Sequence, residues 1–264
     1  MNTPGLAMLC RDLYGEHADP ERLPLSARFD EVDATLVFDD VLVPWDRIFV
    51  YRNPSRAAMF HGRISGLWAG YSTLVRLAVK LDVFIGLADL LSQWAGRKDR
   101  GMQVAIGQLV ADREILLACL RTAETDATRT AAGFLAPRLN RAYRVHGIEA
   151  ADRAVRLLQD VLTSSLVLTG GASDLAAAAI GPYVERFFRN NAPTTRDHLR
   201  LLAIAADATV SSFAGRSQLY ERLQSGEPDN MRAQLYRQTD RTASTQRLLQ
   251  FIHDDTWSAP SATH

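Results

Sequence analysis

The first of two segments with chemistry suited to a phosphorylated ligand is TGGAS, residues 169–173. Gly170 and Gly171 leave the backbone N–H groups accessible at an expected helix junction, and threonine and serine hydroxyls flank them. This arrangement suits a phosphate or pyrophosphate group. The alternative is a plain helix cap, in which the glycines only permit the turn between two helices.

The second segment is SFAGR, residues 212–216. Ser212 and Arg216 are four positions apart and therefore share one helix face, and Gly215 permits close approach of the backbone. A guanidinium at Arg216 has the geometry to bind a diphosphate through two hydrogen bonds. The alternative is an ordinary helix surface on which the arginine forms a salt bridge.

The rest of the chemical inventory predicts no metal site and identifies no catalytic residue. The chain has no Walker loop, dinucleotide GxGxxG, HExxH or GxSxG motif, and its six histidines lack metal-ligand spacing. Asp39 and Asp40 are adjacent, so in a strand they would face opposite sides and would not share a proton. We interpret them as turn residues.

Composition favours a globular protein with small-molecule or protein partners. Of 264 residues, 47% are hydrophobic, and 30 basic residues balance 30 acidic ones without a block of like charge. We therefore expect neither nucleic acid nor membrane as a partner. Cys10 and Cys119 are isolated and the N-terminus lacks an export signal pattern, which predicts a reduced cytoplasmic setting.

The stretch from Phe29 to Tyr51 predicts a strand, a turn and a second extended piece. Residues Pro4 to Cys10 predict one further strand. At Pro44 the chain should leave the sheet, and Trp45 should pack onto the next layer. A sheet of two or three strands has unpaired edges, so we expect another chain or further sequence to complete it.

Helical periodicity begins after residue 53 and predicts four long helices, at about 67–96, 101–133, 147–168 and 195–224, with a short one at about 183–189. The short loop GRKDRG makes the first two antiparallel neighbours. The fold class is thus mostly α, an antiparallel four-helix bundle preceded by a small β segment. The domains are a β segment at 1–52, a bundle at 53–228 and a tail at 229–264 that serves as a subunit contact.

The segment PLSARFDEVDATLVFDDVLVPWDRIFVY, residues 24–51, resembles the end of the central β domain in the oxygenase component of two-component 4-hydroxyphenylacetate 3-monooxygenases. The similarity continues to LYERL and LYRQTDR, so it covers nearly the whole chain but only the second half of a family member. It implies a fold similar to that of acyl-CoA dehydrogenases, in which flavin lies between the β domain and the helical bundle.

The resemblance also implies site residues and partners. SSFAGRSQLYERL is similar to a serine-phenylalanine-glycine-x-arginine segment that contacts FAD, which assigns cofactor contacts to Ser212, Phe213, Gly215 and Arg216; Ala214 stands where the family usually has glycine. Reduced FAD from a separate flavin reductase, a phenolic substrate hydroxylated ortho to its hydroxyl group, and a tetramer or dimer of identical chains are the implied partners.

No catalytic residue follows from the resemblance, because the family's substrate-binding residues belong to the half without a counterpart here. The chain alone is therefore expected to bind flavin weakly and to hydroxylate nothing. The alternatives are a non-catalytic helical assembly subunit or a truncated gene product, and a protein like 4-hydroxybutyryl-CoA dehydratase. The last resembles the fold but binds an iron-sulfur cluster, and Ala69 and Arg76, which occupy its ligand positions here, do not bind iron.

Overall fold

The structure is a computed structural model that describes residues 3–60, 66–139, 141–168, 170–223 and 227–253. Its strands are β1 (Leu6–Cys10), β2 (Ala34–Phe38), β3 (Thr128–Arg129) and β4 (Leu135–Ala136). Its helices are α1 (Ser26–Phe29), α2 (Pro54–Phe60), α3 (Gly66–Trp94), α4 (Arg100–Thr125), α5 (Ala142–Leu162), α6 (Ser165–Leu168), α7 (Ala172–Ala176), α8 (Gly181–Phe188), α9 (Thr195–Thr209), α10 (Ser212–Leu223), α11 (Pro228–Gln238) and α12 (Thr242–Ile252), with a 3-10 turn at Trp45–Arg47.

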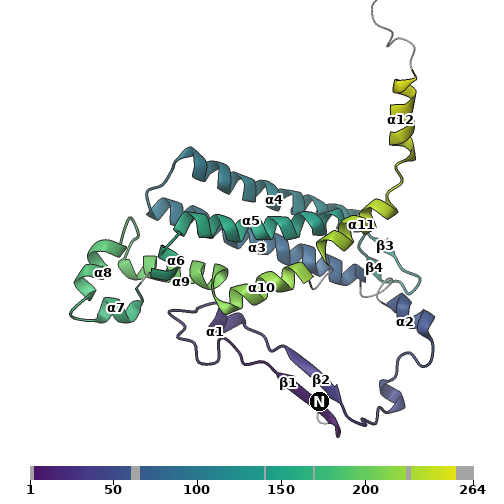
Figure 1. The fold of residues 1–264 in the computed structure, drawn as a ribbon, viewed down its shortest axis with the longest axis horizontal. Helices are drawn as coiled ribbons and strands as arrows, with labels where there is room; N and C mark the ends of the chain where they lie inside the picture. The colour runs from purple at the N-terminus through teal and green to yellow at the C-terminus, as the bar shows by residue number, and fades with distance from the viewer. Residues whose placement is uncertain (1–2, 61–65, 140, 169, 224–226, 254–264) are drawn as a thin grey trace, which may run out of the picture.

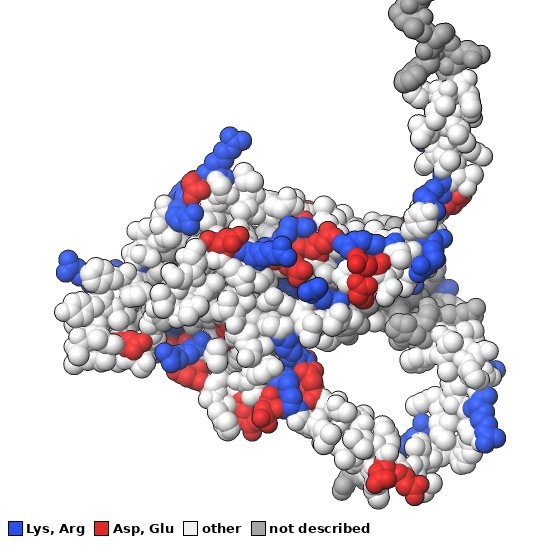
Figure 2. Space-filling view, viewed as in Figure 1, with Lys and Arg blue, Asp and Glu red and all other residues white. Residues whose placement is uncertain are grey.

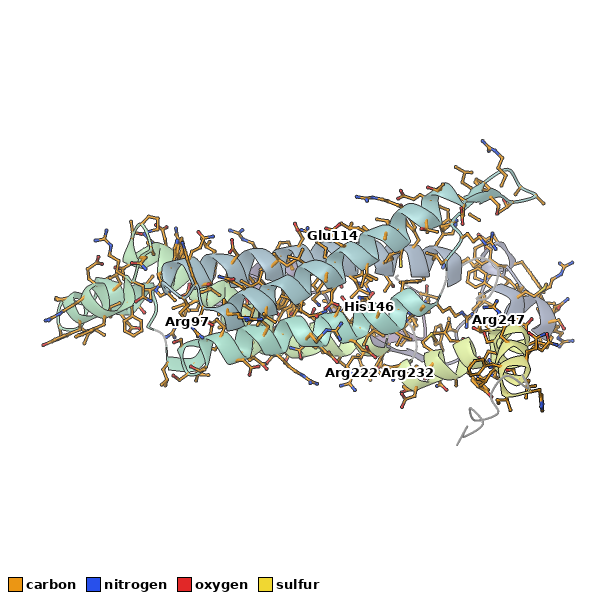
Figure 3. The ribbon with its side chains drawn as sticks, turned by 90° about the horizontal axis from the view of Figure 1, so that it is seen from above. Arg97, Glu114, His146, Arg222, Arg232 and Arg247 are labelled. Carbon is orange, nitrogen blue, oxygen red and sulfur yellow. The ribbon has the colours of Figure 1, made fainter. Side chains whose placement is uncertain are left out.

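The body of the protein is the predicted antiparallel bundle, in which α3, α4 and α5 lie side by side and α9 packs against α3 and α5 (Figures 1 and 3). The predicted stripe on the first long helix is buried, with Leu74 and Ala88 fully excluded from solvent. Leu116 on α4 and Leu158 on α5 meet it in one hydrophobic core. The mostly α fold class is confirmed.

Local capping explains where the long helices begin and end. The Asp99 side chain accepts a hydrogen bond from the Met102 N–H at 3.1 Å and starts α4. Thr194 starts α9 in the same way, through a 3.1 Å bond from the Asp197 N–H. Gly96, with a φ of 69°, follows the end of α3 and permits the turn toward α4.

Three helix boundaries differ from the sequence-based predictions. The second helix ends at Thr125 rather than near residue 133, because the chain turns into the β3–β4 hairpin. The third ends at Leu162, and Thr163 takes a φ of 47° before α6 begins. The fourth divides into α9 and α10, because the Ser211 hydroxyl accepts from the Ala214 N–H at 3.0 Å and caps a new helix.

The first two strands form an antiparallel pair, with Leu6 opposite Phe38 and Cys10 opposite Ala34. We call residues 6–38 the β unit; its strands lie apart from the bundle, and it approaches the bundle through α1, near α10 (Figure 1). The predicted second extended piece after Asp40 pairs with no strand among the described residues. Both faces of the pair carry exposed side chains, so the pair has almost no core of its own.

The prediction that Trp45 packs onto the next layer is wrong. Its side chain is 69% exposed, and its ring meets the edge of Tyr51 at a centroid distance of 4.8 Å. The segment that carries the 3-10 turn at Trp45–Arg47 connects β2 to α2 and lies apart from the body of the bundle (Figure 1). Phe38 and Phe49 are also exposed, and Figure 2 shows acidic and basic groups interspersed with uncharged surface on this arm of the molecule.

The C-terminal region contains α11, which stays on the bundle through an ion pair of Arg232 with Glu149 on α5. Helix α12 projects away from the body, and four of its large apolar side chains are exposed: Leu248, Leu249, Phe251 and Ile252. Residues 254–264 of the predicted tail lie outside the described part of the chain, and its role as a subunit contact stays a prediction. Within the described ranges, none of the helices combines the length and apolar character that crossing a membrane requires.

Tyr143 on α5 is buried against α3, where Gly70 makes room for it: a Cβ at Gly70 would lie 2.5 Å from the tyrosine hydroxyl. Burial raises the pKa of Tyr143 to about 12. Above pH 10 the unfolded tyrosine loses its proton while the folded one keeps it, so stability falls as pH rises through this window. Near pH 11 this loss should amount to about 1 kcal/mol.

Tyr143→Phe should remove this part of the alkaline loss. We expect the difference in unfolding free energy between wild type and variant to shrink by about 1 kcal/mol from pH 9 to pH 11, measured by urea denaturation. Tyr183→Phe, at a side chain that is 64% exposed, is the matched control. Parallel pH profiles for wild type and Tyr143→Phe would contradict the prediction.

Candidate functional site

A cavity of about 450 Å³ lies between the loop before α1 and helices α6, α7 and α9. Its walls are mainly apolar, from Leu23, Leu166, Leu199, Leu202 and Val210. Its size is in the range of small-molecule sites, which are typically apolar pockets with a few polar groups placed at defined points.

Arginines surround this cavity. Arg196 and Arg200, one turn apart on α9, both bind Glu21; the shortest contact joins Arg200 Nη2 to Glu21 Oε1 at 2.6 Å. The hydrogen bonds from Arg200 lower the pKa of Glu21. Arg22 is exposed and, among the described residues, its side chain forms no hydrogen bond or ion pair. Three guanidinium groups and one carboxylate thus line the cavity, and even with the Asp174 carboxylate beside the glycines the local charge is positive.

The predicted glycines line this cavity. Gly171 is also the N-cap of α7, and its N–H donates to Asp174 Oδ2 at 2.7 Å, so the plain cap that was the alternative interpretation is present. A Cβ at Gly171 would lie 3.3 Å from Arg22 Nε, which places that guanidinium beside the glycines. Thr169 lies outside the described residues.

The other predicted segment approaches the same cavity only at its edge. Val210 and Ser211 line it, whereas Ser212, which is exposed, and the rest of α10 do not. Gly215 is also exposed, and a Cβ there would meet no atom within 4 Å. Phe213 is half-buried and Ala214 is buried, so the glycine of the family pattern is replaced by a residue that packs inward.

Arg216 does not line the cavity and binds the β unit instead. Its Nε and Nη2 donate to the two carboxylate oxygens of Asp33 at 2.6 and 2.8 Å, and Nη2 also lies 3.5 Å from Glu31 Oε2. The salt bridge that was the alternative interpretation of this segment is therefore present. The contacts with FAD that the resemblance implies for Ser212, Phe213, Gly215 and Arg216 stay predictions.

Asp207 on α9 anchors the end of the loop that forms one wall of the cavity. Its buried carboxylate accepts hydrogen bonds from the N–H groups of Leu25 and Ser26, both at 2.8 Å, and from the Ser26 hydroxyl at 2.5 Å. These bonds hold the start of α1 and hence the loop that carries Glu21 and Arg22. Sequence reasoning missed Asp207 because its partners are more than 180 positions away.

A second buried acid, Glu221, connects α10 to α3. Arg76 donates two hydrogen bonds to its carboxylate, at 3.0 and 2.9 Å, and Lys80 Nζ lies 3.5 Å away. Burial, opposed by Glu221, lowers the pKa of Lys80. Arg76 is the residue at one of the aligned iron-ligand positions of the dehydratase, and here it serves as an ion-pair partner.

The structure shares an acyl-CoA dehydrogenase-like fold with proteins about twice its length, and consists of a short β unit followed by an antiparallel helical bundle. The chain belongs to the 4-hydroxyphenylacetate 3-hydroxylase family: its C-terminal family model matches residues 57–253 and its N-terminal model matches residues 1–50.

Two relatives illustrate the family. The pyoverdin chromophore biosynthetic protein PvcC of Pseudomonas aeruginosa is 35% identical over 88% of this chain and 48% of its own length. The oxygenase component of a 4-nitrophenol 2-monooxygenase from a Rhodococcus species is 34% identical over 89% of this chain and 47% of its own. The chain thus spans about half the length of the curated relatives it matches.

Solved structures agree with this assignment. The oxygenase component HpaB of 4-hydroxyphenylacetate 3-monooxygenase, complexed with FAD, superposes with a TM-score of 0.87 at 27% identity, covering 96% of this chain and 54% of the other. An archaeal 4-hydroxybutyryl-CoA dehydratase from N. maritimus superposes with a TM-score of 0.82 at 18% identity, which shows a shared fold.

Proposed function

We propose that this chain is the C-terminal part of the oxygenase component of a two-component phenol hydroxylase, which uses reduced FAD to add one oxygen atom ortho to a phenolic hydroxyl. A separate flavin reductase would supply the reduced cofactor. The proposal is supported by relatives that are oxygenase components acting on 4-hydroxyphenylacetate or 4-nitrophenol. It is also supported by the likeness to a structure that contains both FAD and 4-hydroxyphenylacetate.

The observation that carries the proposal is the mainly apolar cavity with arginines at its edge. Gly170 and Gly171 of the first predicted segment line it, and so does Ser211, which precedes the second segment. Its apolar walls suit a flat aromatic ring, and its arginines suit the phosphates of a dinucleotide. These features fit part of an FAD molecule.

In this proposal the chain binds and orients the cofactor. The apolar walls exclude water from the ring they contact, and the glycines let the ligand approach the backbone closely. Bound reduced FAD would supply the electrons that activate molecular oxygen. We assign no catalytic residue to the described part of the chain.

Ala203→Phe tests the proposal by filling the cavity from its α9 wall. We expect FAD affinity, measured by equilibrium titration of flavin fluorescence, to fall by about tenfold, because the ring would occupy the space of the ligand. Ala111→Phe, at an exposed position of α4, is the matched control and should bind like wild type. Unchanged affinity in Ala203→Phe, with its fold retained by circular dichroism, would place the flavin elsewhere.

We also propose that the protein is a cytoplasmic homo-oligomer, either a dimer or a tetramer. The exposed apolar side chains of α12 and of the β unit support it, because a monomer leaves them in water. The same surface favours the second candidate, a helical assembly subunit without its own chemistry. FAD binding that is sensitive to Ala203→Phe separates the first candidate from the second.

A further inference from the structure

We propose that Arg22 contacts the phosphate groups of the ligand, while Arg216 is a positioning residue that holds the β unit against α10. The proposal deepens the function given above, because it rests on a phosphorylated ligand in the cavity. It assigns different tasks to two arginines, one of which the family resemblance had assigned to the cofactor.

The geometry of Arg216 supports its role in holding the β unit against α10, a contact that we call the Arg216 clamp. Its guanidinium and the Asp33 carboxylate form two nearly equal hydrogen bonds, at 2.6 and 2.8 Å, which is the paired geometry that arginine otherwise offers to phosphate. The side chain is only 18% exposed. A diphosphate would have to displace Asp33 to reach the same two donors.

The surrounding charges also disfavour an anion at Arg216. Arg11 donates from Nε to Asp33 at 3.0 Å and from Nη2 to Asp30 at 2.7 Å, so Asp33 is shared between two arginines. Glu31 is the third carboxylate of this network. Two guanidinium groups thus face three carboxylates, and the excess charge is negative.

The network is, however, well placed to join two parts of the fold. Arg11 follows β1, Asp33 precedes β2, and Arg216 lies on the second turn of α10. The backbone N–H of Arg11 also donates to the Asp33 carbonyl at 3.0 Å, which continues the pairing of the two strands. Breaking the Arg216–Asp33 pair therefore frees the β unit from α10 without removing a strand.

At the cavity the balance of charge is the reverse of that around Arg216, because positive groups outnumber carboxylates. Glu21 binds Arg196 and Arg200 but not Arg22, and the Asp174 carboxylate lies beside the glycines, so three guanidinium groups face two carboxylates. Arg22 is exposed beside Gly171, where a ligand phosphate would meet an arginine with no partner among the described residues. An incoming anion finds excess positive charge here and can bind the Arg22 guanidinium without breaking an ion pair, although the Gly171 N–H is taken by Asp174.

Two measurements on the full chain test the proposal. The first is titration with FAD and with inorganic pyrophosphate. We expect Arg22→Gln to weaken both by at least about fivefold, since it removes a charge-assisted hydrogen bond, and Arg28→Gln on α1, also exposed, to leave both unchanged. Unchanged binding in Arg22→Gln, or no pyrophosphate binding by wild type, would overturn the role given to Arg22.

The second measurement is hydrogen exchange of the β1 and β2 amides, which needs no ligand. Arg216→Gln and Asp33→Asn should each speed exchange by about tenfold, because each removes the charged pair that joins the β unit to α10. Wild-type exchange in both single variants would overturn the clamp. So would loss of pyrophosphate binding in Arg216→Gln but not in Asp33→Asn, since a phosphate ligand would then explain Arg216.

The two measurements also separate the failure modes. If the flavin proposal is wrong, wild type binds neither ligand while the exchange rates still respond to the clamp variants. If only the clamp is wrong, FAD binding and its sensitivity to Ala203→Phe persist with unchanged exchange rates.

Discussion

Asp207→Ala is expected to lower the free energy of unfolding by about 3 kcal/mol, because it leaves two N–H groups and one hydroxyl without their buried acceptor. The carboxylate of Asp207 is fully excluded from solvent, so water does not replace it in the folded protein. Ser26→Ala removes only the hydroxyl donor and should cost about 1 kcal/mol. Urea denaturation of both variants measures the two effects.

Asp160→Ala on α5 is the matched control, because Asp160 is exposed and should change stability by no more than about 0.5 kcal/mol. Hydrogen exchange should also accelerate at residues 21–29 in Asp207→Ala, since this loop loses its anchor. Equal stabilities of Asp207→Ala and Asp160→Ala would show that the three hydrogen bonds to the carboxylate contribute nothing net.

Glu221→Ala should destabilise the protein by a similar amount, about 3 kcal/mol at pH 7, for a different reason. Glu221 is 5% exposed, and its loss leaves Arg76 and Lys80 as neighbouring, partly buried cations without their carboxylate. Chemical denaturation compares it with Glu185→Ala, in which an exposed carboxylate on α8 is removed.

The pH dependence distinguishes this mechanism from simple loss of packing. The pKa of Lys80 is already lowered in the folded protein, mainly by burial, and removing Glu221 lowers it further. In the window below the unfolded lysine pKa the unfolded chain binds more protons, so stability rises with pH. The deficit of Glu221→Ala should therefore shrink between pH 7 and pH 10, and a constant deficit would point to packing alone.

The sequence by itself determined the parts of the fold that depend on local periodicity. Spacings of three and four residues identified the buried stripe that includes Leu74 and Ala88, because a helix places such positions on one face. Local residue types also located Gly96 as the turn after the first long helix. The segment at residues 24–51 was enough to indicate the family, since motif similarity needs no knowledge of contacts.

The tertiary structure decided what the polar residues do. The sequence allowed Arg216 to bind a diphosphate or to form a salt bridge, and in the folded chain it forms a salt bridge with Asp33, 183 positions earlier. The hydrogen bond between Ser26 and Asp207 depends on the tertiary fold, which brings the start of α1 next to α9. The break between α9 and α10 depended on one hydroxyl, that of Ser211, whose cap competes with continued helix. Periodicity reports which side of a helix is buried, whereas a hydrogen bond between distant residues depends on the packing that brings them together.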